Sequence, residues 1–289
     1  MIQGEQLGFA GMPRRLYPCT PTRLTTWLDC PRRYRFAYLD RPPLPKGPPW
    51  AHNSLGASIH TALADWWRLR LAERTPESAG RLLVQRWIGD GYRDPEQSAA
   101  WRDHARAMVE SYSARLDPED EPVGIERTVA TRTERVALSG RIDRLDDRGG
   151  EVVVVDYKTG RHILTTGDAR GSLALAIYAM AAARVLRRPC WRVELHHLPT
   201  GQVVAWQHTD ESLARHLRRA EDLAAECAAA DAAWADRADG DTLDELFPEH
   251  PSPRCGWCDF VRHCPVGRAA APARQPWAGL DAGALVGQA

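Results

Sequence analysis

Lysine is nearly absent from this chain of 289 residues, in which lysine and arginine together number 38. Only Lys46 and Lys158 occur, so arginine carries almost all of the positive charge. A retained lysine is therefore of interest, although two lysines are too few to exclude chance. An excess of positive charge is also lacking, because the formal net charge is +0 at pH 7. Any contact with nucleic acid would have to use a local basic patch.

Long apolar runs are missing as well. No stretch approaches the roughly 18 apolar residues that span a bilayer, and the N-terminal residues lack the apolar core of a signal peptide. We therefore expect a cytoplasmic protein with no membrane partner. The seven cysteines are odd in number and, in a reducing compartment, are unsuited to a disulfide framework. Metal ligation is the leading use for any cysteines that cluster.

The spacing of apolar residues along the chain changes clearly near Gly124. Apolar residues recur at helical spacing before it, and β-branched runs after it predict strands. We expect helical segments at 21–39, either as one helix or as two broken at Pro31, and at 56–72, 82–87 and 98–116, with a Pro-rich loop at 41–50. Strands are expected at 124–132, 136–146, 151–158, 191–199 and 202–208, with helices at 172–187 and 210–235. This order predicts an α/β fold with a mixed sheet and helices on its faces.

A Gly-Gly pair at 149–150 separates two of the strands and suits a type I′ hairpin turn. Counting back from the turn places Asp143 opposite Asp156, and Arg141 opposite Lys158. Opposed carboxylates repel one another, and a divalent cation such as Mg²⁺ would compensate. Lys158 shares a face with Asp156, where it could neutralise a phosphate or help to deprotonate a water.

An alternative needs no metal. The same hairpin end could be an ordinary set of ion pairs, in which Arg141, Arg144 and Lys158 neutralise the two acids. The spacing alone does not separate these two interpretations.

The segment "GRIDRLDDRGGEVVVVDYKTG" resembles the core of RecB-like nucleases of the PD-(D/E)XK superfamily. The resemblance implies a restriction-endonuclease-like sheet core of the αβββαβ type. It also implies that Asp143, Asp156 and Lys158 are catalytic, and that both acids and the backbone carbonyl of Tyr157 bind Mg²⁺ or Mn²⁺.

Two further segments extend the resemblance. "LGASIHTAL" is similar to the histidine motif of the family, which implies His60 as a metal ligand, whereas without the family a histidine on an apolar helix is more often a core residue. "LALAIYAMAA" resembles the helix that lines the DNA strand, which implies a contact by Tyr178, although Ala174 stands where the family usually has Gln. Glu126 could be an additional carboxylate near the metal or an exposed strand residue.

The cysteines of "CGWCDFVRHCP" have ligand spacing. Three thiolates need a fourth ligand, which for zinc could be His263 or His250 and for an iron–sulfur cluster would be another thiolate. The segment "LDCPRRYRF" resembles the N-terminal cysteine motif of the AddB nuclease domain and of small CRISPR-adaptation nucleases. That resemblance implies a [4Fe–4S] cluster, with the ligands Cys30, Cys255, Cys258 and Cys264. The other cysteines, Cys19, Cys190 and Cys227, are expected to be ordinary thiols.

Basic residues gather beside the first of these ligands. Arg32, Arg33 and Arg35 flank an aromatic ring, and charge with rings is what a single-strand binding surface needs. A solvated arginine face is the alternative interpretation.

We therefore expect a nuclease domain at 21–268, after an N-terminal extension at 1–20 and before a disordered tail at 269–289. Within it we place a helical insertion at about 60–118, a sheet core at about 124–208 and an iron–sulfur segment at 255–264. The implied function is a metal-dependent DNA exonuclease that acts on single strands or free ends in repair or recombination. Any helicase would be a separate partner, because the chain has no GxxxxGK[ST] phosphate loop. The alternatives are a catalytically silent module that binds DNA ends and a zinc-binding regulator.

Overall fold

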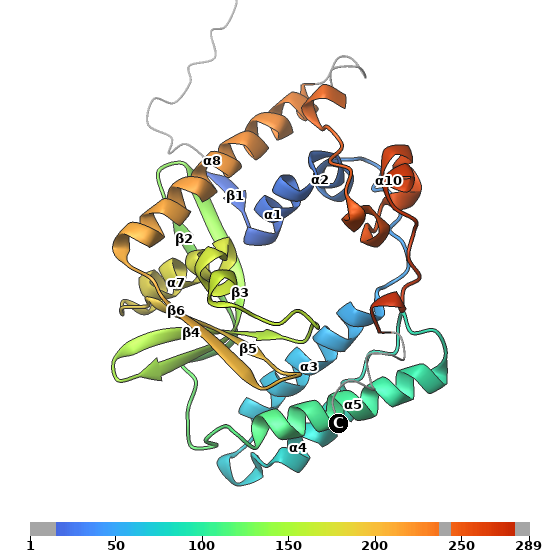
Figure 1. Ribbon diagram of the computed structural model, residues 1–289. Coiled ribbons are helices and arrows are strands. Elements are labelled where there is room, and N and C mark those ends of the chain that lie inside the picture. The colour runs from blue at the N-terminus through green and yellow to red at the C-terminus, as the bar shows by residue number, and fades with distance from the viewer. Residues whose placement is uncertain (1–15, 237–243, 281–289) are drawn as a thin grey trace, which may run out of the picture.

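The computed structural model describes residues 16–236 and 244–280, and it places helices first, a sheet in the middle and short helical turns last (Figure 1). The helical part contains α1 (Pro21–Asp29), α2 (Pro31–Tyr38), α3 (Ala51–Trp67), the turn η1 (Leu71–Glu73), α4 (Pro76–Gln85) and α5 (Pro95–Ser113). The sheet part contains β1 (Tyr17–Cys19), β2 (Gly124–Arg132), β3 (Val136–Arg148), β4 (Glu151–Lys158), α6 (Thr166–Gly171), α7 (Leu173–Leu186), β5 (Arg192–His197), β6 (Gln202–Gln207) and α8 (Asp210–Ala235). The last part contains η2 (Pro253–Trp257), η3 (Val261–His263), α10 (Pro265–Ala270) and η4 (Ala278–Leu280).

The strands form one mixed sheet in the order β1-β3-β4-β5-β6, with β2 paired to β3. The β1·β3 and β4·β5 pairs are parallel and the others are antiparallel. The expected mixed α/β sheet flanked by helices is therefore confirmed. The short strand β1 was not expected, because three residues are too few to show a period of two.

The two faces of β4 meet different helices. Val153, Val155 and Tyr157 pack against α3, α4 and α5, whereas Val152 and Val154 pack against α7. Because strand side chains alternate between faces, every residue of this strand from Val152 to Val155 is buried. The strand is held on both sides and provides a rigid support for the residues that follow Val155.

The hairpin between β3 and β4 has the expected turn and register. Gly149 and Gly150 have φ values of 63° and 97°, the left-handed conformation that a type I′ turn requires. The strands pair from Arg148↔Glu151 to Arg144↔Val155, and the ladder ends there. The pair that was expected next, Asp143 with Asp156, lies just past the last paired residues.

The segment 21–39, which we expected as one helix or as two, forms two helices that are separated at Cys30 and Pro31. Cys30 ends α1 and caps the N-terminus of α2, where its sulfur accepts the N–H of Arg33 at 3.4 Å. The third helix begins at Ala51 rather than at Gly56. Gly56 therefore lies inside the helix and does not mark its start. The glycine suits a close approach to Thr159, since a Cβ at this position would lie 3.3 Å from Oγ1 of that residue.

The chain after Arg268 differs from the disordered tail that we expected. Leu280 is 4% exposed, and its carbonyl accepts hydrogen bonds from Trp101 Nε1 at 2.9 Å and Gln97 Nε2 at 3.2 Å. The Ala-, Gly- and Pro-rich sequence of this segment does not predict an ordered structure. Its order depends on contacts with α5, almost 180 residues away in the sequence. The last residues of the expected tail, 281–289, lie outside the described part, as do residues 1–15 of the expected extension.

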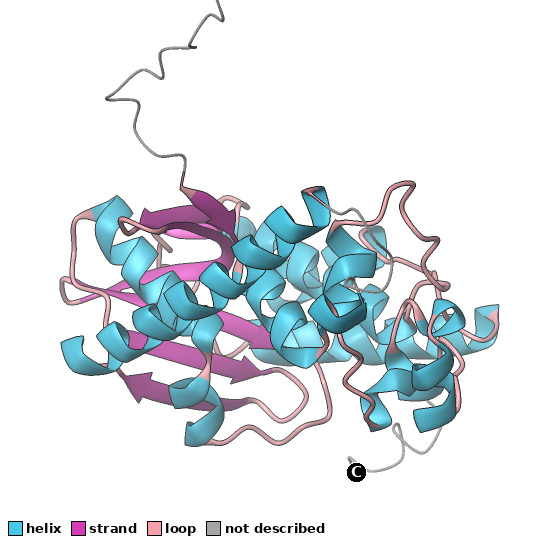
Figure 2. Ribbon diagram, turned by 90° about the horizontal axis from the view of Figure 1, so that it is seen from above, coloured by secondary structure: helices cyan, strands magenta, loops and turns pink. Residues whose placement is uncertain are grey.

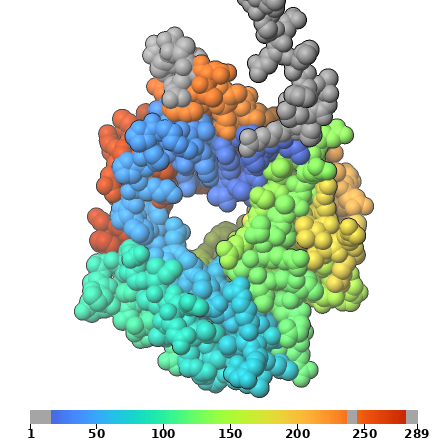
Figure 3. All heavy atoms as spheres, turned by 180° about the vertical axis from the view of Figure 1, so that it is seen from behind, coloured from blue at the N-terminus to red at the C-terminus, as the bar shows by residue number. Residues whose placement is uncertain are grey.

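The elements are arranged around an opening. The sheet lies on one side of the molecule and the C-terminal turns lie on the other (Figure 2). The space-filling view shows that the opening passes through the protein, with α1 and α2 above, α3 below, the residues that precede α3 at one side and the strands at the other (Figure 3). In the described ranges, no helix has the length and apolar character needed to cross a bilayer.

We predict that Leu280→Ala lowers the free energy of unfolding by about 2–3 kcal/mol, because it removes a buried leucine side chain from the core beside α5. Chemical denaturation measures the change. Leu71→Ala is the matched control, since Leu71 is 50% exposed and its loss should change stability by less than about 0.5 kcal/mol. Equal effects of the two substitutions would mean that the C-terminal segment does not pack as described.

Candidate active site

The site begins where β3 and β4 part. Past the last ladder pair, the backbone N–H of Tyr157 is bound by a side chain, Oδ2 of Asp143, at 2.8 Å. This bond satisfies a donor that the ladder has left free and fixes the Asp143 carboxylate between the strands. The other oxygen of Asp143 remains available to further partners.

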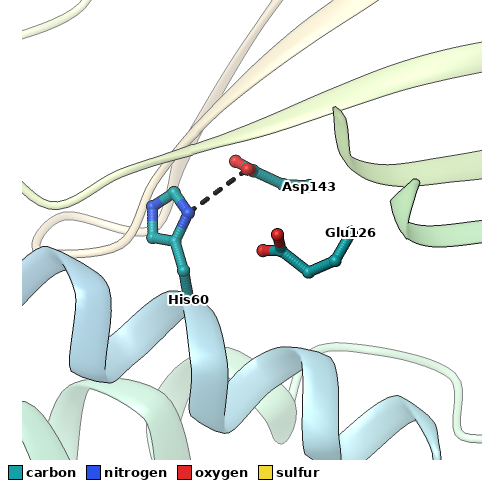
Figure 4. A group of neighbouring side chains, drawn as sticks. All are labelled: His60, Glu126 and Asp143. Carbon is teal, nitrogen blue, oxygen red and sulfur yellow. Dashed lines mark ion pairs between the residues drawn. The ribbon is translucent and has the colours of Figure 1, made fainter. Parts of the chain in front are cut away.

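Three groups with metal-ligand chemistry converge on that carboxylate. The ligand atoms of His60, Glu126 and Asp143 all lie within 4.8 Å of one another, and they come from α3, β2 and β3 (Figure 4). Nδ1 of His60 faces Oδ1 of Asp143 at 3.2 Å. A cation and a proton are both suited to a position between these atoms.

Glu126 reaches this group through an unusual backbone conformation. Its φ is 47°, in the left-handed region that few residues other than glycine adopt. The pairs Ile125↔Arg144 and Arg127↔Ile142 bracket it, so the register places Glu126 opposite Asp143. Two carboxylates thus face each other across β2 and β3, at a point where the ladder is distorted.

Asp156 and Lys158 occupy the end of β4. Their side chains form an ion pair with Oδ2 and Nζ 2.5 Å apart. That oxygen is buried, and it has no hydrogen bond of good geometry within the described chain. Lys158 keeps 45% of its side chain exposed, so its ammonium group also reaches the solvent side of the site.

Burial and mutual repulsion shift the pKa of these groups. Burial raises the pKa of Asp156, Lys158 opposes the rise, and Asp143 adds to it, so the net shift is upward. Burial also raises the pKa of Glu126, and Asp143 raises it further against the opposing charge of Arg141. For His60, burial lowers the pKa, but the surrounding carboxylates outweigh it and the net shift is upward. Without a cation the site therefore favours binding protons.

A cavity of about 360 Å³ opens beside these carboxylates, and two arginines line it. Arg141 forms an ion pair with Glu126 at 2.5 Å while 65% of its side chain is exposed. Arg68 caps the C-terminal end of α3, eight residues after His60; half of its side chain is exposed, and it pairs with Asp65 at 3.1 Å. Arg68 was not predicted from the sequence, although a spacing of eight residues, about two helical turns, could have placed it on the face of His60.

Tyr178 lies near the acids but partly within the protein. Burial raises its pKa to about 12, and the charges of Asp156 and Asp143 add to the rise. Its ring also occupies the space that a side chain at Gly140 would need, with Cε1 2.3 Å from a Cβ built there. Tyr157, whose carbonyl we expect as a ligand, has a buried ring 5.7 Å from the His60 ring.

The four cysteines of the expected cluster line one cavity of about 380 Å³, between α2 and the C-terminal turns. Backbone N–H groups point at three of the sulfur atoms: Arg33 to Cys30 at 3.4 Å, Ser252 to Cys255 at 3.4 Å, and Gly267 to Cys264 at 3.2 Å. Burial raises the pKa of Cys258, the fourth. Cys19, Cys190 and Cys227 lie elsewhere, in the apolar cores of the sheet and its helices.

The two histidines considered as zinc ligands differ in position. His250 lines the cysteine cavity, whereas Nε2 of His263 is 3.0 Å from the carbonyl of Pro45. In the described residues, no three cysteine sulfurs lie within 4.8 Å of one another. Ligands on a single zinc ion, at about 2.3 Å each, would lie closer together than this.

The three arginines expected to contact DNA are placed differently from one another. Arg32 forms ion pairs with Asp244 and Glu249 and is 13% exposed, and Arg35 is bound to Asp40. Their donors are used within the protein. Arg33 is the most exposed of the three, at 39% of its side chain, and it forms a longer ion pair with Asp29, at 3.9 Å.

Comparison with known proteins gives a family match. Residues 18–265 match the PD-(D/E)XK nuclease superfamily. No curated protein matches the chain. Among solved structures, SSO0001 has a TM-score of 0.38 and 14% identity, over 88% of each chain. A candidate exonuclease from Eubacterium rectale has a TM-score of 0.42 and 9% identity, over 76% of this chain and 84% of its own. At these TM-scores neither likeness supports a conclusion about this chain.

We predict that Glu126→Gln stabilises the metal-free protein, because it removes one of two facing carboxylates, an effect on the order of 0.2–1 kcal/mol. The same change should reduce the stabilisation that Mg²⁺ or Mn²⁺ provides, because a neutral amide binds these hard cations less well than a carboxylate. Thermal unfolding in a chelator and during a metal titration measures both effects.

Glu134→Gln is the control for this experiment, since Glu134 is exposed in the turn between β2 and β3. A Glu126→Gln protein that is less stable in the chelator and responds to metal as the wild type does would exclude Glu126 from the metal centre.

Proposed function

The chain belongs to the PD-(D/E)XK nuclease superfamily, and from this premise we propose that it is a metal-dependent DNA exonuclease that hydrolyses single strands from their ends. We also propose a nuclease domain at 21–268 with a RecB-like core, and the superfamily match at 18–265 supports the extent of that domain. The observation that carries the proposal is the convergence of His60, Glu126 and Asp143 beside the pair of Asp156 and Lys158.

These residues suit a hard divalent cation. Carboxylate oxygens are the ligands that Mg²⁺ and Mn²⁺ prefer, and the buried Oδ2 of Asp156 has an ion pair with Lys158 but no hydrogen-bond partner among the described residues. We propose that Asp143, Asp156, His60 and the carbonyl of Tyr157 hold the ion, with Glu126 beside them. Such an ion polarises a phosphoryl oxygen and lowers the pKa of a bound water.

The remaining side chains position the substrate. Lys158 has a half-exposed ammonium group at the end of a strand that is held on both faces, so it is fixed where a phosphate can reach it. Its charge stabilises the negative charge that develops on the phosphate during attack. Arg68 and Arg141 line the cavity beside His60, Glu126 and Asp143 and can hold neighbouring phosphates.

The opening through the protein favours a single strand as the substrate. One strand with its flexible backbone can enter such an opening by its end, and α3 and the strands, which carry the proposed metal ligands, border it (Figure 3). In a free-standing nuclease of this kind, duplex DNA would first have to be separated by another protein. We therefore propose that a helicase supplies the strand during repair or recombination.

We also propose that a [4Fe–4S] cluster joins Cys30 to Cys255, Cys258 and Cys264. The four side chains line one cavity, and backbone N–H groups directed at sulfur are a common feature around such clusters.

Replacing Lys158 by Ala should reduce cleavage by at least about 10²-fold, because it removes a charge that acts on the reacting phosphate. Asp143→Ala should do the same through loss of the metal. The assay follows end-labelled linear single strands, blunt duplexes and closed circular single strands with Mg²⁺ or Mn²⁺, and the linear strand should be the substrate. Lys46→Ala is the control, because Lys46 is exposed in the Pro-rich loop.

Wild-type rates for Lys158→Ala would remove this lysine from the mechanism. Cleavage of the closed circle as fast as the linear strand would contradict an exonuclease while leaving the nuclease assignment intact.

For the cluster, protein purified without oxygen should be brown and contain about four irons per chain. Cys30→Ala should remove the iron and destabilise the protein as severely as Cys258→Ala. The cluster would close a loop of 225 positions, and this restriction of the unfolded chain stabilises the folded state by up to about 5 kcal/mol. Cys190→Ala, at a buried thiol outside the cavity, should keep the iron. Colourless protein with stoichiometric zinc would overturn this assignment.

A further inference from the structure

A second cavity lies next to the metal centre and is not used by the chemistry above. Its volume is about 770 Å³, and it lies between the first turn of α3, the loop after β4 and the C-terminal segment. His52 and Trp257 provide aromatic walls, and Arg161 and Arg274 provide positive charge. No carboxylate is among its lining residues in the described chain, in contrast to the acidic cavity beside it.

The two cavities are adjacent along α3. Gly56 lines both of them, one turn before His60. Thr159, which directly follows Lys158, also lines the second cavity and contacts this glycine. His52 and His60 are eight residues apart, about 12 Å along the helix, which is roughly the length of three stacked nucleotides.

The aromatic groups are already assembled in the protein. The rings of His52 and Trp257 have centroids 5.5 Å apart, and Trp50 lies 5.2 Å from Trp257. The guanidinium of Arg274 lies over the Trp257 ring at 5.0 Å. Rings together with arginine are the chemistry that binds the base and the phosphate of a single strand.

The outer wall of the cavity is also fixed in place. The backbone N–H of Arg274 donates to Gly256 at 3.0 Å, and the N–H of Ala51 donates to Pro276 at 3.1 Å. The Arg161 guanidinium donates to the carbonyl of Gly279, which leaves other N–H groups of the same side chain free for a ligand. A preformed site loses little conformational entropy on binding.

We propose that this cavity binds one nucleotide of the substrate strand, a few positions from the bond that is cut. The base packs against His52 and Trp257, and Arg161 and Arg274 hold its phosphate. The proposal rests on the proposed function, because it assumes that the strand runs through the opening past the metal centre. It makes Trp257 a residue that sets the register of the strand.

The test measures binding without cleavage. Fluorescence anisotropy in a chelator follows full-length protein with single-stranded oligonucleotides, each carrying one abasic position at a different distance from the end. The wild type should bind about 5- to 100-fold less well when the abasic position falls at one particular distance. Trp257→Leu should abolish that dependence on position, and Trp257→Phe should retain it, because phenylalanine keeps an aromatic ring.

A second measurement tests the phosphate contact. Arg274→Gln should reduce the slope of log K against log salt concentration by about 0.7, the value for one phosphate of a single strand. Arg215→Gln is the control, because Arg215 is exposed on α8 and pairs with Glu211. It should leave the slope unchanged.

An equal effect of the abasic position at every distance, or the same pattern in Trp257→Leu as in the wild type, would overturn the proposal. So would an Arg274→Gln slope equal to that of the wild type. These outcomes are independent of cleavage, which the metal-dependent assay reports separately. A protein that cuts DNA but shows no such dependence keeps the proposed function and loses this subsite.

Discussion

The separation of β3 from β4 at Asp143 is the constraint on which the site depends. An uninterrupted ladder would bind the N–H of Tyr157 to the neighbouring strand and leave the Asp143 carboxylate on an ordinary sheet surface. Because the ladder ends at Arg144↔Val155, the carboxylate accepts that N–H and lies between the strands. Asp156 and Lys158 follow on β4 past its last pair with β3, and they stay fixed because β4 remains paired with β5 as far as Lys158.

The cost of this arrangement is negative charge gathered in one place. Glu126 and Asp143 face each other, and the pKa of Glu126 is raised by burial and by that neighbour. The backbone of Glu126 is also held in the left-handed region, which a side chain rarely adopts. Strain and repulsion of this kind persist when the surrounding structure is stable for other reasons, and here the apolar packing on both faces of β4 provides that stability.

The sequence was most informative where structure is local. A Gly-Gly turn and a run of β-branched residues determine the hairpin and its register within about twenty residues, and these features place Asp143 near Asp156 without any long-range information. Glu126 could not be assigned because its position depends on a backbone angle that no residue pattern shows. Arg32 is bound to Asp244 and Glu249, more than 200 residues away, so its availability to DNA could not be inferred. The contacts of Leu280 could not be inferred either, because its partners on α5 are also far away in the sequence.

The opening through the molecule has a consequence for how long a strand stays bound. A protein with a formal net charge of +0 has little long-range attraction for a polyanion, and salt weakens what attraction it has. A strand that has entered a closed opening, however, is retained by topology and leaves only by sliding to an end. Its residence time would then grow with the length of the strand. For the exonuclease that we propose, the ring that these segments form would make digestion processive without strong binding.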